Sequence, residues 1–316
     1  MEIDRVCVIG GSGFVGSHIV RLLSAQRYLV RVPTRQRERA KHLILLPTVD
    51  VFEANVHDAA ELGNLVRGMD AVVNLVGVLH DGRGERGFEQ AHVALTGKVI
   101  AACETHGVRR LVHMSALGAD VNAPSKYQRT KGAAEAMVRA SSLDWTIFRP
   151  SVVFGRGDRF LNLFATLQRL LPVIFLGSPN ARFQPVYVED VAAAYVHGLT
   201  ERSAYGRAHD LCGPKVYTLR ELVALVGAIT GHARPIVGLN DTLSHLQALA
   251  MELLPVKLLT RDNYHSMKID NISSEPFPFG IAPQAIEAVV PTYLGDQSPR
   301  ARYRAYRDHA GRASAR

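Results

Sequence analysis

The sequence has few cysteines, and their positions predict neither a cross-link nor a metal site. Only three of its 316 residues are cysteine, at Cys7, Cys103 and Cys212, an odd number spread far apart. This excludes a disulfide framework and a CxxC metal or redox motif, and it predicts a reducing compartment. The 13 histidines are scattered without an HxxxH or HExxH pair, so we expect no metal site.

A long apolar run and a targeting segment are also lacking. Uncharged stretches such as 170–181 stay well short of the roughly 18 apolar residues that suggest a membrane span. The first four residues include two acids and lead into an apolar run, without the basic region and apolar stretch of a signal peptide. We therefore expect a cytoplasmic protein that does not cross a bilayer.

The formal net charge of +8 is unevenly distributed. Residues 296–316 hold six arginines against two acidic residues. We expect this segment to be a mobile, solvated tail. Contact with an anionic surface is the alternative, but the segment lacks the apolar face of an interfacial helix. The charge distribution does not favour a nucleic-acid partner.

A glycine-rich segment follows the first apolar run of the chain. Gly10, Gly13 and Gly16 lie between the strand-like residues 6–9 and the helix-like residues 17–23. Glycines at a strand-to-helix turn let the backbone approach a pyrophosphate, and the helix N-terminus supplies free N–H groups. The segment therefore predicts dinucleotide binding; the alternative is a turn that uses glycine only for its positive φ.

Short β-rich runs alternate with helix-length segments through the first half of the chain. The runs are apolar on both faces, which is typical of parallel strands covered by helices on both sides. Predicted strands span 6–9, 29–32, 49–52, 71–76, 111–114 and 146–148. We predict an α/β fold, with a Rossmann-type doubly wound parallel sheet and a smaller C-terminal substrate lobe.

The alternation loosens after Pro150. We assign residues 1–150 to the dinucleotide-binding domain, 151–295 mainly to a substrate or partner lobe, and 296–316 to the basic tail. A strand at 184–188, a helix at 191–199 and a strand at 210–212 predict that the chain returns to the main sheet at about residues 182–212.

A second candidate site combines a serine, a tyrosine and a lysine. Tyr127 and Lys131 are four residues apart on a predicted helix, and an ammonium on the same face lowers the cost of ionising the phenol. Ser115 follows the predicted strand 111–114, where it can hold a reacting oxygen at the carboxyl edge of the sheet. YxxxK alone is common, and an exposed helix face is the alternative interpretation.

These two sites together resemble the short-chain dehydrogenase/reductase superfamily, in its extended or atypical branch. The resemblance covers about residues 5–270. Gly10, Gly13 and Gly16 match the glycine loop of the superfamily, and Ser115, Tyr127 and Lys131 match its catalytic serine, tyrosine and lysine. It implies an NAD(P)-dependent oxidoreductase whose lysine also holds the nicotinamide ribose. The epimerase/dehydratase variant of the superfamily uses the same residues.

Four sequence blocks are similar to a narrower family, the nucleotide-binding accessory subunits of respiratory complex I and their bacterial relatives. The blocks are Ser125–Lys131, Phe154–Asn162, Gln184–Val191 and Leu259–Asn263. This resemblance implies NADPH held as a structural ligand, and association with a respiratory complex or with the inner face of a membrane. His92 departs from the superfamily, which often places an asparagine there, and we favour a helix-packing or capping role for it over catalysis.

The end of the second predicted strand lacks the acidic residue that NAD enzymes place on the ribose 2′-hydroxyl. Arg35 follows it instead, with Arg37 nearby, and a guanidinium pairs bidentately with phosphate. We favour NADP(H) as the cofactor, with NAD(H) as the alternative. A further interpretation of these arginines is a basic, solvated helix start that binds no ligand. The resemblance adds as cofactor-lining residues Phe14, Val15, Asn55, Val56, Asn74, Val76, Gly77 and Pro150.

The substrate lobe is less informative. Its phenylalanines, Phe154, Phe160, Phe164 and Phe175, can line an apolar pocket but are more often core residues. Leucines in 239–259 form one apolar helical face, which we expect to cover the lobe; docking on a membrane or partner is the alternative. We predict hydride transfer with an apolar, quinone-like or lipid-like carbonyl or hydroxyl compound. A non-catalytic NADPH-binding accessory or sensing subunit is the second hypothesis.

Overall fold

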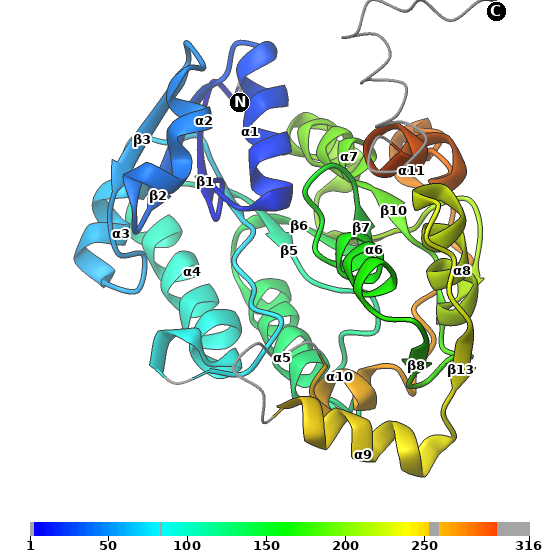
Figure 1. Cartoon of the computed structure of the whole chain (residues 1–316). Coiled ribbons are helices and arrows are strands. Elements are labelled where there is room, and N and C mark those ends of the chain that lie inside the picture. Colours follow the sequence, from blue (N-terminus) through cyan, green and yellow to red (C-terminus); the bar gives the residue numbers. More distant parts are fainter. Residues whose placement is uncertain (1–2, 83, 253–258, 296–316) are drawn as a thin grey trace, which may run out of the picture. The chain divides into compact units, whose positions relative to one another are not determined.

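A seven-stranded parallel sheet forms the centre of the first structural unit (Figure 1). The computed structural model describes residues 3–82, 84–252 and 259–295. The strand order is β11-β6-β5-β4-β1-β2-β3, and every neighbouring pair is parallel. The strands are β1 Arg5–Ile9, β2 Leu29–Thr34, β3 Val49–Glu53, β4 Ala71–Asn74, β5 Arg110–Met114, β6 Asp144–Pro150 and β11 Arg207–Leu211. The predicted Rossmann-type α/β fold is confirmed.

Two groups of helices flank this sheet. They are α1 Phe14–Ala25, α2 Lys41–Ile44, α3 Ala59–Val66, α4 Leu95–Thr105, α5 Lys126–Ala140 and α7 Val188–Thr200. Helix α1 packs on α7, while α3 packs on α4 and α4 on α5. The chain adds β2 and β3 on one side of β1 and then crosses back to β4 on the other. Right-handed crossovers therefore place α3, α4 and α5 on the opposite face.

The reversal of strand order between β1 and β4 sets the position of the site. Cys7 on β1 pairs with Arg31 of β2 on one side and with Val72 of β4 on the other. In doubly wound sheets this reversal marks the place at the carboxyl edge where ligands bind, between the loops that follow β1 and β4. The three cysteines are free and buried.

The first unit comprises Met1–Ser151, Val188–Cys212 and Ser273–Ala282, and the second comprises Val152–Tyr187, Gly213–Ile272 and the residues from Pro283. The predicted strand at 184–188 is only Val186–Tyr187 (β10), and it pairs with β7 (Val153–Phe154) in the second unit rather than in the main sheet. The strand that returns to the main sheet is β11, because its residues extend along β6 over five positions.

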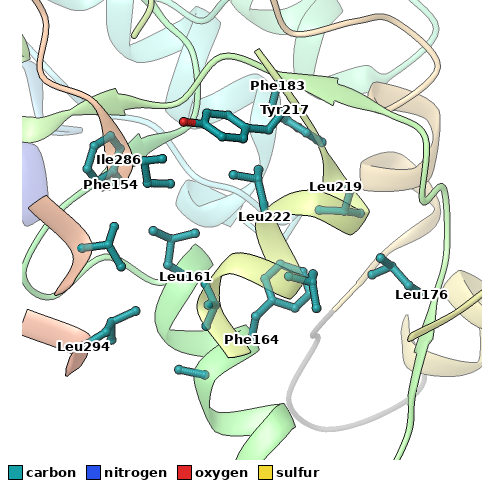
Figure 2. Close-up of a cluster of buried hydrophobic side chains, with 14 of the residues drawn as sticks. Phe154, Leu161, Phe164, Leu176, Phe183, Tyr217, Leu219, Leu222, Ile286 and Leu294 are labelled. Atoms are coloured by element: carbon teal, nitrogen blue, oxygen red, sulfur yellow. The ribbon is translucent and has the colours of Figure 1, made fainter. Parts of the chain in front are cut away.

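The second unit has its own hydrophobic core (Figure 2). Its helices are α6 Phe160–Leu170, α8 Leu219–Thr230, α9 Asp241–Glu252, α10 Arg261–Ser266 and α11 Ile286–Leu294. Its remaining strands are β8 Ile174–Leu176, β9 Arg182–Phe183, β12 Tyr217–Thr218 and β13 Ile236–Gly238. Phe154 and Phe164 are buried in this core and Phe160 packs against it, as core residues do, whereas Phe175 is 59% exposed.

Helix α9 turns its leucines away from the protein. Its buried residues are Ser244 and Ala248, while Leu243, Leu246 and Leu249 are 47%, 57% and 38% exposed. The side chain of Gln247 also faces inward and donates to the Phe175 carbonyl oxygen at 2.8 Å. The expectation that the leucine face covers the lobe is therefore wrong, because the small and polar residues make the contact. Leu253 and Leu254, and the tail 296–316, lie outside the described residues.

Candidate nucleotide-binding and active site

The glycine loop between β1 and α1 has no room for side chains at its closest points. A Cβ added to Gly16 would lie 2.3 Å from the Gly10 carbonyl oxygen, so only glycine allows α1 to pack on the loop. Gly10 has φ of +85°, in the left-handed region. A Cβ on Gly13 would meet only the Gly10 oxygen, at 3.2 Å.

The N-terminus of α1 is suited to an anion. Gly13 is its N-cap, no side chain caps it, and its first turn holds no acidic residue. The first N–H groups of a helix have no partner within the helix, and those of Phe14, Val15 and Gly16 are in this position. A pyrophosphate fits this end of the helix because it supplies the acceptors and the negative charge that the helix lacks.

Arg35 lies exposed just beyond the end of β2. After β3, the side chain of Asn55 accepts from the His57 N–H at 3.0 Å and donates to Glu85 Oε1 at 3.0 Å. That hydrogen bond, together with the nearby His57 and Arg35, holds the pKa of Glu85 below its ordinary value. A carboxylate is therefore present at this end of the sheet, although β2 supplies none.

Sequence reasoning missed this carboxylate. Glu85 comes from a 3-10 turn, Gly84–Arg86, in the segment that joins β4 to α4. It lies 30 residues after Asn55, and nothing in its local sequence marks it as part of a site. Val56, the residue after Asn55, packs against the hydrophobic core of the first unit.

The residues after β4 form a turn that is held from inside the protein. Asn74 is 1% exposed; its Oδ1 accepts from the Val76 N–H at 3.3 Å, and its Nδ2 lies 3.4 Å from both Thr96 Oγ1 and His113 Nδ1. Asn74 thus supports the turn rather than presenting a free amide. Gly77 passes close to Lys131, since a Cβ at this position would lie 3.1 Å from Nζ.

Ser115 and the Lys131 ammonium both lie at the carboxyl end of β5. Ser115 is 2% exposed, its N–H donates to the Phe148 carbonyl oxygen at 2.8 Å, and its hydroxyl is buried without a protein partner. The Lys131 ammonium donates to the carbonyl oxygens of Met114 at 3.0 Å and Val76 at 3.4 Å. Burial lowers the pKa of Lys131 to about 8.

Helix α5 carries both Tyr127 and Lys131. Its N-cap is Ser125, whose side chain accepts from the Gln128 N–H. Tyr127 is partly buried, and its ring packs edge-on against Phe88 and His92, with centroids 5.8 and 5.5 Å away. At the end of β6, the carbonyl oxygen of Pro150 accepts from the Leu117 N–H at 3.1 Å, which ties the loop after Ser115 to that strand.

His92 is packed inside the protein, in a π-helical turn that spans Glu89–Ala94 and precedes α4. Both of its ring nitrogens make hydrogen bonds, to Val78 and to Thr130. This arrangement agrees with the packing role expected from the sequence. Among the residues that the structure describes, no group of three or more histidine, cysteine or acidic side chains could hold a metal ion.

Comparisons with known proteins identify relatives of the chain. Residues 10–158 match a family described as NAD(P)H-binding. NADH dehydrogenase (ubiquinone) 1 alpha subcomplex subunit 9, mitochondrial, of Arabidopsis thaliana is 35% identical over 228 residues, which are 69% of this chain and 56% of that protein. Ceramide reductase of Caulobacter vibrioides is 29% identical over 192 residues, 60% of this chain and 59% of that protein. The chain thus spans little more than half the length of these relatives.

A nucleoside-diphosphate-sugar epimerase from Staphylococcus aureus shares the fold. The two structures superpose with a TM-score of 0.73 at 16% sequence identity, covering 92% of this chain and 99% of that one. The sheet order and the glycine loop define a Rossmann-type dinucleotide-binding fold, and the family match indicates a nicotinamide cofactor. Residues 10–158 match the NAD(P)H-binding family, and the chain is similar in sequence to the complex I subunit from Arabidopsis thaliana.

Proposed function

We propose that the protein is an NADP(H)-dependent oxidoreductase that acts on an apolar carbonyl or hydroxyl compound. The observation that carries the proposal is that the Lys131 ammonium is buried and donates to backbone carbonyl oxygens rather than to a carboxylate. Among the residues that the structure describes, Glu135, one turn further along α5, is the one acid that influences the pKa of Lys131. A positive charge that no carboxylate neutralises can stabilise a neighbouring tyrosinate.

Glu135 is already neutralised by arginine. Its Oε1 accepts from Arg149 Nε at 2.7 Å and its Oε2 from Arg149 Nη2 at 2.5 Å, and Arg139 adds a longer contact of 3.4 Å. This bidentate pair occupies both carboxylate oxygens. The positive charge of Lys131 therefore remains available to stabilise a tyrosinate at Tyr127.

The proposed roles follow from these placements. A bound nicotinamide supplies a hydride to a carbonyl carbon or accepts one from the corresponding alcohol. During reduction Tyr127 donates its phenolic proton to the substrate oxygen, and Lys131 stabilises the tyrosinate that is left. Ser115 donates a hydrogen bond from its hydroxyl to the same oxygen and holds it in place without giving up its proton; the buried hydroxyl has no protein partner in this structure.

The preference for NADP(H) rests on Arg35. Its exposed guanidinium follows β2, whose last residues include no acid, and can pair with a ribose 2′-phosphate. Glu85 is the counter-charge that a phosphate would have to displace or tolerate. The remaining predicted cofactor contacts would be made by the α1 N-terminus, Asn55 and the Val76–Gly77 turn.

A second candidate function is that of a non-catalytic NADPH-binding accessory or sensing subunit. It is favoured by the similarity to the mitochondrial complex I subunit and by the exposed leucines of α9, which offer an apolar contact for a partner or a membrane surface. No described helix is long and apolar enough to span a bilayer. In this proposal the protein works in the cytoplasm, peripherally at the inner face of a membrane.

Isotope transfer tests the catalytic proposal. The purified protein is incubated with NADPH deuterated on either face of the nicotinamide and with a lipid extract, and mass spectrometry follows the label. We expect label in a compound with the wild-type protein and none with Tyr127→Phe. Tight NADPH binding without transfer, repeated with extracts of different polarity, would reject the enzyme in favour of the accessory subunit.

A further inference from the structure

His92 connects the turn after β4 to helix α5. Its Nε2 lies 3.1 Å from the Val78 backbone nitrogen, and its Nδ1 lies 2.9 Å from Thr130 Oγ1. The Val78 N–H can only donate, so Nε2 is the acceptor and the ring proton is on Nδ1. The Thr130 hydroxyl donates to the carbonyl oxygen of Lys126 or Tyr127, each 3.0 Å away, which leaves its oxygen free to accept from Nδ1.

The imidazole is therefore neutral and has no unused nitrogen. Burial, with Lys131 and His113 nearby, lowers the pKa of His92 to about 2. The ring has no free lone pair and no free proton, so it cannot pass protons between Lys131 and solvent. Its role must be exerted through the groups that it contacts.

The turn after β4 is held from two sides. Lys131 Nζ donates to the Val76 carbonyl oxygen at 3.4 Å, and His92 Nε2 accepts from the Val78 N–H two residues later. Gly77 lies between them: a Cβ there would be 3.1 Å from Lys131 Nζ and 3.8 Å from His92 Nε2. The backbone of the turn is thus clamped between the lysine and the histidine.

The same ring supports Tyr127. Phe88 stacks on His92 with ring centroids 5.4 Å apart and planes at 20°, and Tyr127 meets His92 at 83°. Phe88 and Tyr127 also touch edge to face. Aromatic groups prefer these stacked and edge-to-face geometries, so the three rings fix one another.

We propose that His92 is a positioning residue: its Nδ1–H imidazole ties the 76–78 turn to α5 and fixes the ring of Tyr127. The importance of His92 for turnover rests on the function proposed above. Its effects on the turn and on nucleotide binding are independent of that function, because neither requires a chemical step.

Two substitutions separate hydrogen bonding from packing. In His92→Gln the side-chain amide oxygen can reach the position of Nε2 and accept from Val78. In His92→Asn the amide ends near the position of Nδ1 and cannot reach Val78. Hydrogen exchange of the Val78 amide, followed by NMR, measures the hydrogen bond to His92 directly. The NADPH Kd, measured by titration, shows whether the turn keeps its position.

For His92→Asn we expect Val78 exchange to be about tenfold faster and the NADPH Kd to rise about tenfold, the size expected for the loss of one buried hydrogen bond. His92→Gln should stay within about threefold of the wild type. His209→Gln, a substitution in β11, is the control and should change neither quantity.

A folded His92→Asn protein with unchanged Val78 exchange and Kd would overturn the proposal. Equal defects in the Asn and Gln variants would overturn it as well, because packing alone would then explain them. If His92→Asn does not fold, Thr130→Val removes the Nδ1 partner, and unchanged Val78 exchange in that variant would reject the clamp. Wild-type protein that transfers no label would overturn the oxidoreductase without affecting these measurements.

Discussion

The Lys131 ammonium lies 3.0 Å from the carbonyl oxygen of Met114, the residue that immediately precedes Ser115. This contact joins the middle of helix α5 to the end of strand β5. It places a buried positive charge beside a serine whose hydroxyl has no protein partner. This arrangement lowers the stability of the protein, because the buried ammonium loses its hydration and is hydrogen-bonded only to backbone carbonyl oxygens.

Replacing Lys131 with methionine should stabilise the protein and abolish the proposed turnover. The pKa of Lys131 is lowered from 10.5 to about 8, so below pH 8 the folded state carries the full cost of the buried charge. At about 1.4 kcal/mol per pKa unit, this cost is at most about 3.5 kcal/mol. Urea unfolding at pH 7 should show Lys131→Met to be more stable by up to that amount.

The sign of the pH dependence provides a further check on Lys131. Between pH 8 and 10.5 the unfolded chain binds more protons at this lysine than the folded protein does, so wild-type stability gains from this group as pH rises. The advantage of Lys131→Met should shrink over the same interval. Lys126→Met, at an exposed lysine of the same helix, is the control. A destabilised, pH-independent Lys131→Met protein would contradict the prediction.

Two glycines of the loop should respond differently to substitution. Gly16→Ala brings a Cβ to 2.3 Å from the Gly10 oxygen and should cost about 1–3 kcal/mol of stability. Gly13→Asp supplies α1 with the side-chain cap that it lacks, so the thermal midpoint should hold or rise while NADPH binding is lost by charge repulsion. Calorimetric titration measures NADPH binding and thermal unfolding measures stability, so together they distinguish the two variants. Retained NADPH binding in Gly13→Asp would place the pyrophosphate elsewhere.

Arg35 should determine the choice between NADPH and NADH. Arg35→Ala is expected to weaken NADPH binding about tenfold or more and to leave NADH unchanged, as expected for the loss of a charged hydrogen bond. Glu85→Gln removes a negative charge near Arg35 and should favour NADPH further. Arg39→Ala, at another exposed arginine, is the matched control. An unchanged NADPH-to-NADH preference in Arg35→Ala would reject the assignment.

The leucines of α9 provide a test of the accessory-subunit proposal. Leu246→Ser, at a 57% exposed position, should change stability by no more than about 0.5 kcal/mol. Leu222→Ser, in the core of the second unit, should cost several kcal/mol. If the face docks, a Leu243→Ser, Leu246→Ser, Leu249→Ser triple variant should no longer sediment with respiratory membranes. Unchanged sedimentation of a folded triple variant would count against this surface.

The central sheet was predictable because its information is local. Each of the six predicted strands of the first half overlaps a strand of the observed sheet, since runs such as 6–9 are apolar on both faces. The glycine loop was readable for a similar reason: spacing within seven residues fixes the turn. Short strands such as β10 were misplaced, because two residues carry no periodicity and their pairing depends on distant partners.

The sequence alone determined the Rossmann class, the nicotinamide cofactor and the candidate set Ser115, Tyr127 and Lys131. Only the tertiary structure brought Glu85 to Asn55, turned the α9 leucines outward, and gave His92 its contacts with Val78 and Thr130. The physical reason is distance along the chain. Periodicity and spacing report what neighbouring residues do, whereas burial, pKa and hydrogen-bond partners arise from segments that meet only after folding.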